Sequence, residues 1–318
     1  MNILITGCAG FIGYNLSEHL LDNKHKILGL DNFDEYYSVD LKKKRIHGLK
    51  KNKNFTFLNI NIADEKKLLN SFKKKKIDLI IHLAAQAGVR YSLINPKKYV
   101  EINIKGFFNM VLLANEKKTK KFIYASSSSV YGDSENFPLK ENEKLNPKNI
   151  YGLSKKINEE IANLKQFNFK INFIGLRFFT IFGEWGRPDM FMFKLFRAFF
   201  LKKTFYLNNY GNHLRDFTYI GDVKNIVLKL VNKKINGHHI FNVCSNKPQN
   251  ILKIVQKFNK KNKTKIKMIS MNKADVLKTH GNNNKIKKFL NYKKFSNFDI
   301  FFDKTFKWYK NNKIYNIK

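Results

Sequence analysis

The chain has 318 residues, 43% of them hydrophobic, which is enough for one large or two modest domains with a substantial core and excludes a disordered chain. Its 61 basic residues outnumber 24 acidic ones and give a formal net charge of +37. Two cysteines, Cys8 and Cys244, are too few for a disulfide framework, and no apolar run reaches membrane-spanning length. With no leader-like segment ahead of Asn2–Thr6, we expect a cytoplasmic protein with no membrane partner.

The positive charge raises the question of nucleic-acid binding. The lysines, however, are spread along the whole chain, as at Lys42–Lys44, Lys73–Lys76 and Lys260–Lys261, together with abundant Asn, Ile and Phe. This distribution is typical of solvated surface lysines in a chain with biased codon usage. We expect no nucleic-acid partner, although the electrostatic field favours an anionic substrate.

The first half alternates short apolar runs with longer periodic segments, the pattern of βαβ units around a parallel sheet. The predicted strands are Asn2–Thr6, Lys26–Leu30, Thr56–Asn59, Asp78–Leu83, Lys121–Ala125 and Asn172–Leu176. The predicted helices are Phe11–Leu21, Glu65–Phe72, Pro96–Ala114 and Ile150–Gln166.

The regular alternation ends after Arg177. A loop at 183–188, a Phe-rich amphipathic helix at Phe191–Phe200 and a strand at Ile240–Val243 follow, and the tail reads as irregular until Phe301–Tyr309. We expect an α/β protein with a Rossmann-type doubly wound parallel sheet in residues 1–178 and a returning segment near 216–246. Residues 179–318 are expected to form most of a smaller α/β substrate-binding domain.

A glycine-rich turn follows the first predicted strand. Gly7 allows a tight turn, Gly10 lets the backbone approach a pyrophosphate, and Gly13 permits close packing of helix and strand. The following helix N-terminus supplies amides and a positive dipole end. Asp31 ends the second strand, where a carboxylate binds ribose hydroxyls and repels a 2′-phosphate. The spacing of the turn is GxxGxxG and not the GxGxxG of the dehydrogenase fingerprint. The turn predicts a dinucleotide, and the Asp31 carboxylate predicts NAD rather than NADP.

Tyr151 and Lys155 are four residues apart on a predicted helix and share one of its faces. A lysine cation near a tyrosine favours the phenolate and is expected to lower its pKa toward the range of a working base. The serine run Ser126–Ser129 lies upstream, and its hydroxyls can bridge the tyrosine to a substrate hydroxyl. These residues predict proton removal from an alcohol whose carbon loses a hydride.

With these motifs assembled, the chain resembles the extended short-chain dehydrogenase/reductase superfamily, and within it the bacterial UDP-glucuronate 4-epimerases. The resemblance covers nearly the whole chain. Its segments are residues 31–37, 84–92, 124–132, 175–180, 185–190, 215–220 and 274–279.

The resemblance implies roles for individual residues. Tyr151 would be the acid/base, Lys155 would bind the nicotinamide ribose and tune Tyr151, and Ser127 would relay the proton. The implied cofactor contacts are Gly7, Gly10, Phe11, Ile12, Gly13, Asp31, Asn32, Asn61, Ile62, Ala84, Tyr151 and Lys155. The implied substrate contacts are Arg90, Asn103, Ser128, Ser129, Thr180, Arg187, Arg215 and Asp275. A homodimer that pairs the helices at 96–114 and 150–166 is also implied.

Two positions in the serine run distinguish epimerisation from dehydration and decarboxylation, the other reactions of related enzymes. Related 4,6-dehydratases carry Asp-Glu, and related decarboxylases a Glu, where this chain has Ser128 and Ser129; neither serine is a carboxylic acid. Epimerisation of UDP-glucuronate at C4, with Arg187 or Arg90 near the substrate carboxylate, is therefore the preferred hypothesis. A UDP-glucose-type 4-epimerase, a UDP-glucuronate decarboxylase and a polyanion-binding protein with an inactive Rossmann scaffold remain the alternatives. No metal site is expected.

Overall fold

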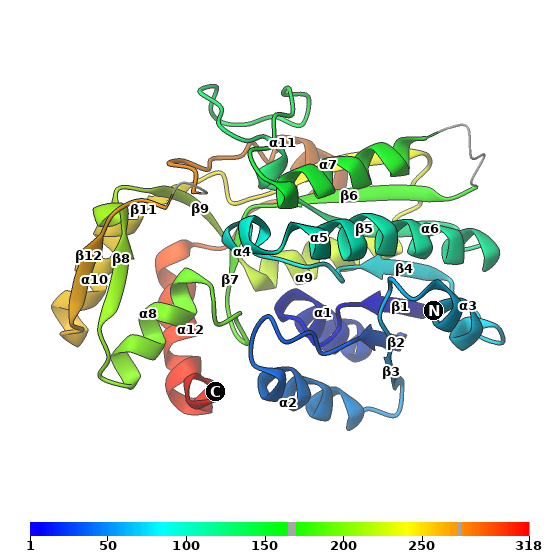
Figure 1. Cartoon of the computed structure of the whole chain (residues 1–318), viewed down its shortest axis with the longest axis horizontal. Helices are drawn as coiled ribbons and strands as arrows, with labels where there is room; N and C mark the ends of the chain where they lie inside the picture. The colour runs from blue at the N-terminus through cyan, green and yellow to red at the C-terminus, as the bar shows by residue number, and fades with distance from the viewer. Residues whose placement is uncertain (165–169, 273–274, 318) are drawn as a thin grey trace.

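The computed structural model describes residues 1–164, 170–272 and 275–317. Within these residues the largest sheet has seven strands in the order β10-β6-β5-β4-β1-β2-β3, and every neighbouring pair is parallel. This order, with its reversal between β1 and β4, defines a Rossmann-type doubly wound fold (Figure 1). The expected fold class is confirmed.

The strands of this sheet are short runs that are mostly buried, as strands covered on both faces must be. Their bounds differ from the predicted ones by two residues or fewer. The strands are β1 (Asn2–Thr6), β2 (Lys26–Asp31), β3 (Phe55–Asn59), β4 (Leu79–His82), β5 (Lys121–Ser127), β6 (Asn172–Phe178) and β10 (His238–Val243).

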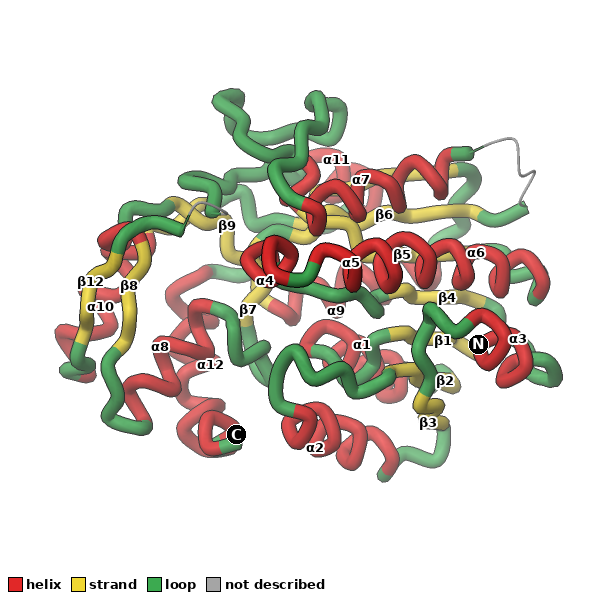
Figure 2. The backbone as a smooth tube through the Cα atoms, in the orientation of Figure 1, coloured by secondary structure: helices red, strands yellow, loops and turns green. Residues whose placement is uncertain are grey.

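Helices cover both faces of the large sheet (Figure 2). One buried cluster joins it to α1 (Phe11–Asp22), α2 (Val39–Lys50) and α9 (Ile220–Asn232). A second cluster, on the opposite face, joins it to α3 (Glu65–Phe72), α6 (Gly106–Glu116) and α7 (Ile150–Asn163). The prediction extended α7 to Gln166, which lies outside the described residues.

The segment predicted as one helix at Pro96–Ala114 is interrupted. It forms α5 (Pro96–Tyr99), a π-helical turn (Val100–Lys105) and α6, preceded by the short helix α4 (Val89–Ile94). Such π turns are frequent at functional sites because they redirect a side chain out of the helical register. Here the π turn contains Asn103, which is buried and bonds to the loop after β4.

Two small sheets lie beyond the carboxyl ends of the large one. The first contains β7 (Thr180–Phe182), β9 (Leu214–Tyr219) and β11 (Pro248–Asn250); the second contains β8 (Phe205–Asn208) and β12 (Ile266–Ile269). Figure 1 places β8 and β12 with α8 (Phe191–Phe200), α10 (Ile251–Asn262) and α12 (Phe298–Asn312) at one end of the molecule.

The expectation of an irregular tail before residue 301 was wrong, because α10, β12 and α11 (Asn284–Leu290) occupy it. Lysine and asparagine fill the solvent faces of these elements, while a few apolar residues such as Ile254 and Phe258 are buried against the core. Their pattern is therefore weak in the sequence, although α10 and α11 each bury an apolar side.

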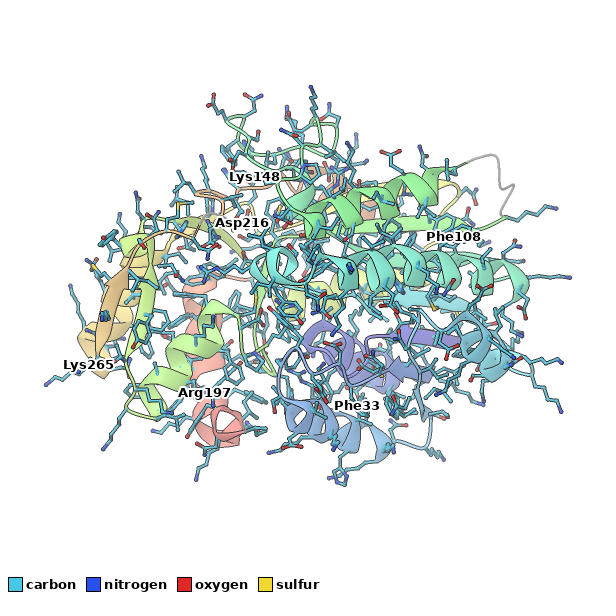
Figure 3. The ribbon with its side chains drawn as sticks, in the orientation of Figure 1. Phe33, Phe108, Lys148, Arg197, Asp216 and Lys265 are labelled. Carbon is cyan, nitrogen blue, oxygen red and sulfur yellow. The ribbon has the colours of Figure 1, made fainter. Side chains whose placement is uncertain are left out.

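The surface carries the excess positive charge. Nitrogen-tipped side chains project around the whole outline of the molecule, Lys148 and Lys265 among them (Figure 3). This distribution agrees with the interpretation of the lysines as solvated residues. Among the described residues, no helix combines the length and apolar character needed to cross a membrane.

Candidate active site

A first cavity of about 280 Å³ opens at the carboxyl ends of β1, β2 and β4, where the strand order reverses. Open α/β sheets bind nucleotides at this position. Every residue that the sequence assigned to the cofactor lines this cavity: Gly7, Gly10, Phe11, Ile12, Gly13, Asp31, Asn32, Asn61, Ile62, Ala84, Tyr151 and Lys155.

The glycine turn has the geometry that a dinucleotide requires. Gly7 adopts φ +72°, and a Cβ there would lie 2.8 Å from the backbone nitrogen of Ala84. A Cβ on Gly13 would lie 2.0 Å from the carbonyl oxygen of Gly7, so only glycine lets α1 begin this close to β1. The turn thus presents bare backbone and the start of α1 to the cavity, which suits a pyrophosphate.

Asp31 lies at the end of β2 and is buried. Its carboxylate accepts hydrogen bonds from the backbone N–H groups of Ala9 (3.1 Å) and Phe33 (2.9 Å). Burial raises the pKa of Asp31, an effect that nearby Lys42 opposes. The neighbouring guanidinium of Arg45 donates to Ala9, Tyr37 and carbonyls of the 185–186 loop, so it is already engaged within the protein. The site fits ribose hydroxyls and the NAD cofactor.

Tyr151 and Lys155 lie on the first turns of α7. Asn149 caps the N-terminus of this helix, and its side chain accepts the backbone N–H of Gly152. Lys155 is 2% exposed, and its Nζ donates to the carbonyl oxygen of Ala125 at 2.8 Å. Burial lowers the pKa of Lys155 to about 8, which Glu159 opposes.

Burial raises the pKa of Tyr151, and Ser127 and Arg187 only partly oppose this rise. The expectation of a lowered pKa for Tyr151 is therefore not met: burial dominates, and the Lys155 ammonium donates to the Ala125 carbonyl on β5.

Ser127 ends β5 and starts the 3₁₀ turn Ser128–Val130. Its Oγ accepts the backbone N–H of Ser129 at 3.1 Å and also bonds to the Ser129 hydroxyl at 3.1 Å. A Cβ on Gly152 would lie 2.5 Å from the Ser129 carbonyl oxygen, so a glycine lets α7 approach this turn closely. Ser127 and Tyr151 both line the first cavity and also a second one.

The second cavity, of about 450 Å³, lies between the large sheet and the two small ones. The described residues that line it include seven of the eight predicted substrate contacts: Arg90, Ser128, Ser129, Thr180, Arg187, Arg215 and Asp275. The cavity is also strongly cationic: its described lining residues include Arg90, Lys148, Arg187, Lys194, Arg215 and Lys278 against only Asp189 and Asp275.

Arg187 borders both cavities and is paired with Asp189. Its Nε and Nη2 donate to the two carboxylate oxygens of Asp189 at 2.5 and 2.8 Å. The hydroxyl of Tyr36 donates to the same carboxylate at 3.2 Å. The fork towards Asp189 leaves the Nη1 group of Arg187 as the donor available to a ligand.

Arg90 and Asp275, which come from opposite sides of the second cavity, form a bidentate pair at 3.1 and 2.7 Å. Arg215 donates to the carbonyl oxygens of Leu214, Val276 and Leu277, and burial lowers its pKa to about 10. Both arginines therefore brace the loop at 275–277 as well as facing the cavity.

Asn103 lies outside the lining of both cavities. Its amide accepts the N–H of Gln86 at 2.7 Å and donates to the Gln86 carbonyl and to Ser154 Oγ, both at 3.0 Å. Ser154 in turn donates to the carbonyl oxygen of Tyr151. The structure thus places Asn103 where it holds α7 against the loop after β4, not where it touches a ligand.

Sequence reasoning gave no role to Tyr36, Asp189 or Lys194, although all three line the second cavity. Tyr36 and Asp189 belong to the segments that carry the family resemblance, and an acid two residues after Arg187 was the signal for an ion pair. Lys194 was hidden in a helix interpreted as core. Lys273, which could supply a cation beside Asn272, lies outside the described residues.

The described residues contain no group of three or more His, Cys, Asp or Glu side chains that could hold a metal ion. They do contain a cavity suited to a dinucleotide and a second, cationic cavity, and Tyr151 and Ser127 line both. This arrangement defines a nucleotide-dependent enzyme of the tyrosine–lysine type, which acts on a hydroxyl-bearing anionic substrate.

The chain belongs to the NAD dependent epimerase/dehydratase family, whose sequence profile matches residues 3–244. It is 35% identical over 314 residues to the UDP-glucuronate 4-epimerase of Thermodesulfobacterium geofontis, covering 97% of this chain and 96% of that one. An uncharacterized protein of Methanocaldococcus jannaschii is 43% identical over 298 residues, covering 92% and 91%. The crystal structure of UDP-glucuronic acid 4-epimerase from Bacillus cereus, in complex with UDP-glucuronic acid and NAD, matches with a TM-score of 0.89 at 29% identity and covers 98% of this chain and 100% of that one.

Proposed function

We infer that this chain catalyses the NAD-dependent 4-epimerisation of UDP-glucuronate to UDP-galacturonate. The observation that carries this inference is that the serine turn lies beside Tyr151, in the place where related enzymes have a carboxylic acid. Among the described residues that line the substrate cavity, the only carboxylates are Asp189 and Asp275, and each is held in a bidentate pair by an arginine. Neither is available to expel a 6-hydroxyl or to assist decarboxylation.

The residues that border both cavities perform the acid/base step. The residues that line the first cavity would hold NAD, whose nicotinamide would supply reversible hydride acceptance for C4. Tyr151 takes the proton of the C4 hydroxyl in its phenolate form, and Ser127 Oγ relays that proton from the substrate hydroxyl to the phenolate oxygen. No unpaired carboxylic acid among the described lining residues is available to drive elimination. The 4-ketone therefore rotates and presents its other face, where C4 takes back the hydride and its oxygen takes back the proton from Tyr151 through Ser127.

Charge supports an anionic sugar nucleotide as the substrate. A diphosphate and a C6 carboxylate together carry three negative charges. The six basic and two acidic residues that line the described part of the second cavity leave four positive charges in excess, which is enough to neutralise them. We propose that Arg187 Nη1 and the Ser128 and Ser129 hydroxyls hold the carboxylate, and that Arg215 and Asp275 contact the diphosphate and ribose. A carboxylate fixed in this way is kept from the orientation in which a β-keto acid loses CO2.

One observation favours the runner-up, an epimerase of neutral UDP-hexoses. Arg187 already has a carboxylate partner in Asp189, so a second carboxylate from the substrate is not needed to neutralise it. A neutral hydroxymethyl group could then occupy the same space.

Incubation of the purified protein with UDP-glucuronate labelled with deuterium at C4 tests the proposal. We expect UDP-galacturonate that retains the label, because the hydride leaves and returns without exchange with water, and a much slower reaction with UDP-glucose. UDP-xylose with released CO2 would make the chain a decarboxylase. Efficient turnover of UDP-glucose with none of UDP-glucuronate would favour the runner-up.

We also propose that the protein is a cytoplasmic homodimer. Apolar side chains on α4, on the π turn and on α7 are exposed although these elements pack against one another: Leu93 (58%), Ile94 (78%), Val100 (48%) and Leu153 (40%). Exposed apolar patches of this kind mark association surfaces. The two buried free cysteines agree with a reducing compartment.

A further inference from the structure

The acid/base residues come from two elements that the chain does not connect directly. Ser127 ends β5, whereas Tyr151 and Lys155 lie on α7. Displacements of about 1 Å can cost roughly a hundredfold in rate, so the relative position of strand and helix matters for catalysis. Two polar contacts tie them together. One is the bond from Lys155 to Ala125, and the other joins Ser126 Oγ to Glu159 Oε1 at 2.5 Å.

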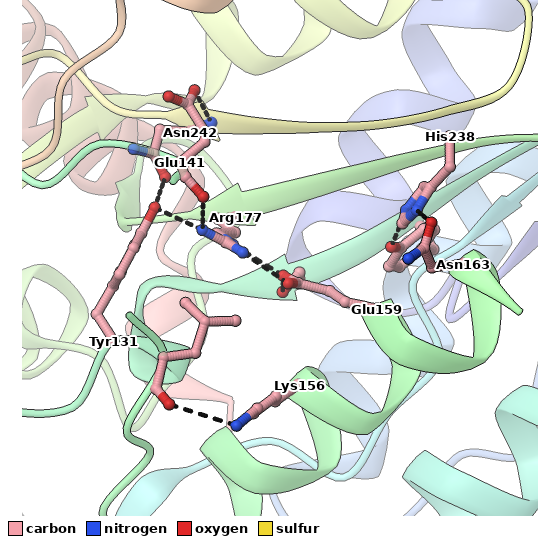
Figure 4. Close-up of polar contacts among 11 residues, drawn as sticks. Tyr131, Glu141, Lys156, Glu159, Asn163, Arg177, His238 and Asn242 are labelled. Atoms are coloured by element: carbon pink, nitrogen blue, oxygen red, sulfur yellow. Dashed lines mark hydrogen bonds and ion pairs between the residues drawn. The ribbon is translucent and has the colours of Figure 1, made fainter. Parts of the chain in front are cut away.

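Glu159 lies one helical turn after Lys155 on the same face of α7 and is 6% exposed. A buried carboxylate is costly unless it is paired and fully hydrogen-bonded. Arg177 supplies the pairing: its Nε donates to Oε1 at 2.9 Å and its Nη2 to Oε2 at 2.7 Å (Figure 4). Arg177 stands opposite Ser126 in the register of β5 and β6, so both side chains reach the same carboxylate.

Arg177 is itself held on its other side. Its Nη1 donates to the hydroxyl of Tyr131 at 2.9 Å and to the carbonyl oxygen of Glu141 at 3.0 Å, and Tyr131 donates to Asn242 at 2.7 Å (Figure 4). The carboxylate of Glu159 thus ends a network that is anchored in β6, β10 and the loop after β5. None of these groups lines the substrate cavity.

The charge of Glu159 also reaches the catalytic lysine. Burial lowers the pKa of Lys155 to about 8, and Glu159 is the group that opposes this fall. On β4, His82 faces Lys155, but burial lowers the pKa of His82 to about 3, which leaves its ring neutral. Tyr151 faces Lys155 from its own helix.

Two further groups face Glu159 itself. They are Tyr124 on β5, whose pKa burial raises well above its usual range, and His238 on β10, whose pKa burial lowers to about 4. Both are neutral near pH 7, so Arg177 is the one charged partner that faces the carboxylate among these groups.

We propose that Glu159 is a positioning residue for the proposed reaction: its carboxylate, braced by Arg177, ties the serine end of β5 to α7 and places a negative charge one helical turn from Lys155. The proposal rests on the assignment of Tyr151 and Lys155 as the working pair. It assigns a role to a residue that touches neither cofactor nor substrate.

Glu159→Gln, which keeps the shape and removes the charge, tests the electrostatic part. Without that charge the Lys155 pKa falls further, so the alkaline limb of the pH dependence of kcat should move to lower pH by about one unit. The pH at which NAD affinity begins to fall should move by the same amount, and this measurement needs no sugar nucleotide. Glu160→Gln, an exposed neighbour on α7, is the matched control and should leave both profiles in place.

Ser126→Ala removes the hydrogen bond between β5 and Glu159 on α7, and it tests the positioning role even if Glu159→Gln fails to fold. It should lower kcat about tenfold while the alkaline limb stays where it is in the wild type, because the charge of Glu159 remains. If both pH profiles of Glu159→Gln match those of the wild type, Glu159 does not act on Lys155 through its charge. If kcat of Ser126→Ala lies within twofold of wild type, the bond between Ser126 and Glu159 does not position the active site. A wild type that binds NAD but turns over no UDP-glucuronate would refute the proposed function instead, and the NAD profiles would still decide the role of Glu159.

Discussion

At the scale of single residues, Tyr151 carries the largest share of the proposed chemistry. It borders both cavities, and burial raises the pKa of its phenol. A proton acceptor of this kind has to be activated when the site fills, and Ser127 is the neighbour that already favours the phenolate. Loss of the hydroxyl should therefore abolish proton transfer without disturbing the cavities.

Tyr151→Phe is expected to lower kcat by roughly 10²–10⁴, as for loss of a general acid/base, while NAD affinity changes little. Steady-state kinetics with UDP-glucuronate and a separate NAD titration measure the two effects. Tyr210→Phe, at an exposed tyrosine, is the control and should have near-normal kinetics. A kcat within threefold of wild type in Tyr151→Phe would remove Tyr151 from the mechanism.

At the scale of elements, the parts that the sequence predicted well are those whose burial leaves a periodic signal. Apolar runs predicted the strands of the large sheet, and the glycine spacing predicted the turn after β1. The predicted cofactor residues line one cavity because the carboxyl ends of parallel strands lie at the same edge of the sheet. The π turn at Val100–Lys105 could not be predicted, because nothing local marks a widened turn. The pairing of Arg187 with Asp189 left only a weak signal, an acid two residues after the arginine, because the pairing depends on how the loop after β7 folds.

That loop supports a second prediction. Asp189→Asn leaves the guanidinium of Arg187, only 22% exposed, without its carboxylate and should destabilise the protein by about 2 kcal/mol. If Arg187 binds the substrate carboxylate, saturating UDP-glucuronate should restore most of the lost Tm, whereas UDP-glucose should not. Asp303→Asn, at an exposed site on α12, should change Tm little. Equal rescue by both sugars would show that Arg187 does not recognise the carboxylate.

At the scale of the whole molecule, the proposed dimer and the active site share an element. The exposed side chains Ile94 and Val100 belong to elements that pack on α7, and α7 carries Tyr151 and Lys155. A partner subunit on this surface would cover apolar area and hold α7 from outside, while Asn103 and Glu159 hold it from within. Association is therefore expected to support catalysis as well as stability.

Ile94→Glu combined with Val100→Glu places two like charges in the proposed contact and should separate the subunits. The wild type should sediment with twice the mass of the 37.5 kDa chain, and the double variant with that of one chain at micromolar concentration. We expect kcat to fall in the double variant, because α7 loses its outer support. Ile300→Glu, at a 65% exposed site on α12, should leave both mass and activity unchanged. A monomeric wild type would exclude the dimer, and a double variant that remains dimeric would place the association surface elsewhere. A monomeric double variant with full activity would show that α7 needs no support from a partner subunit.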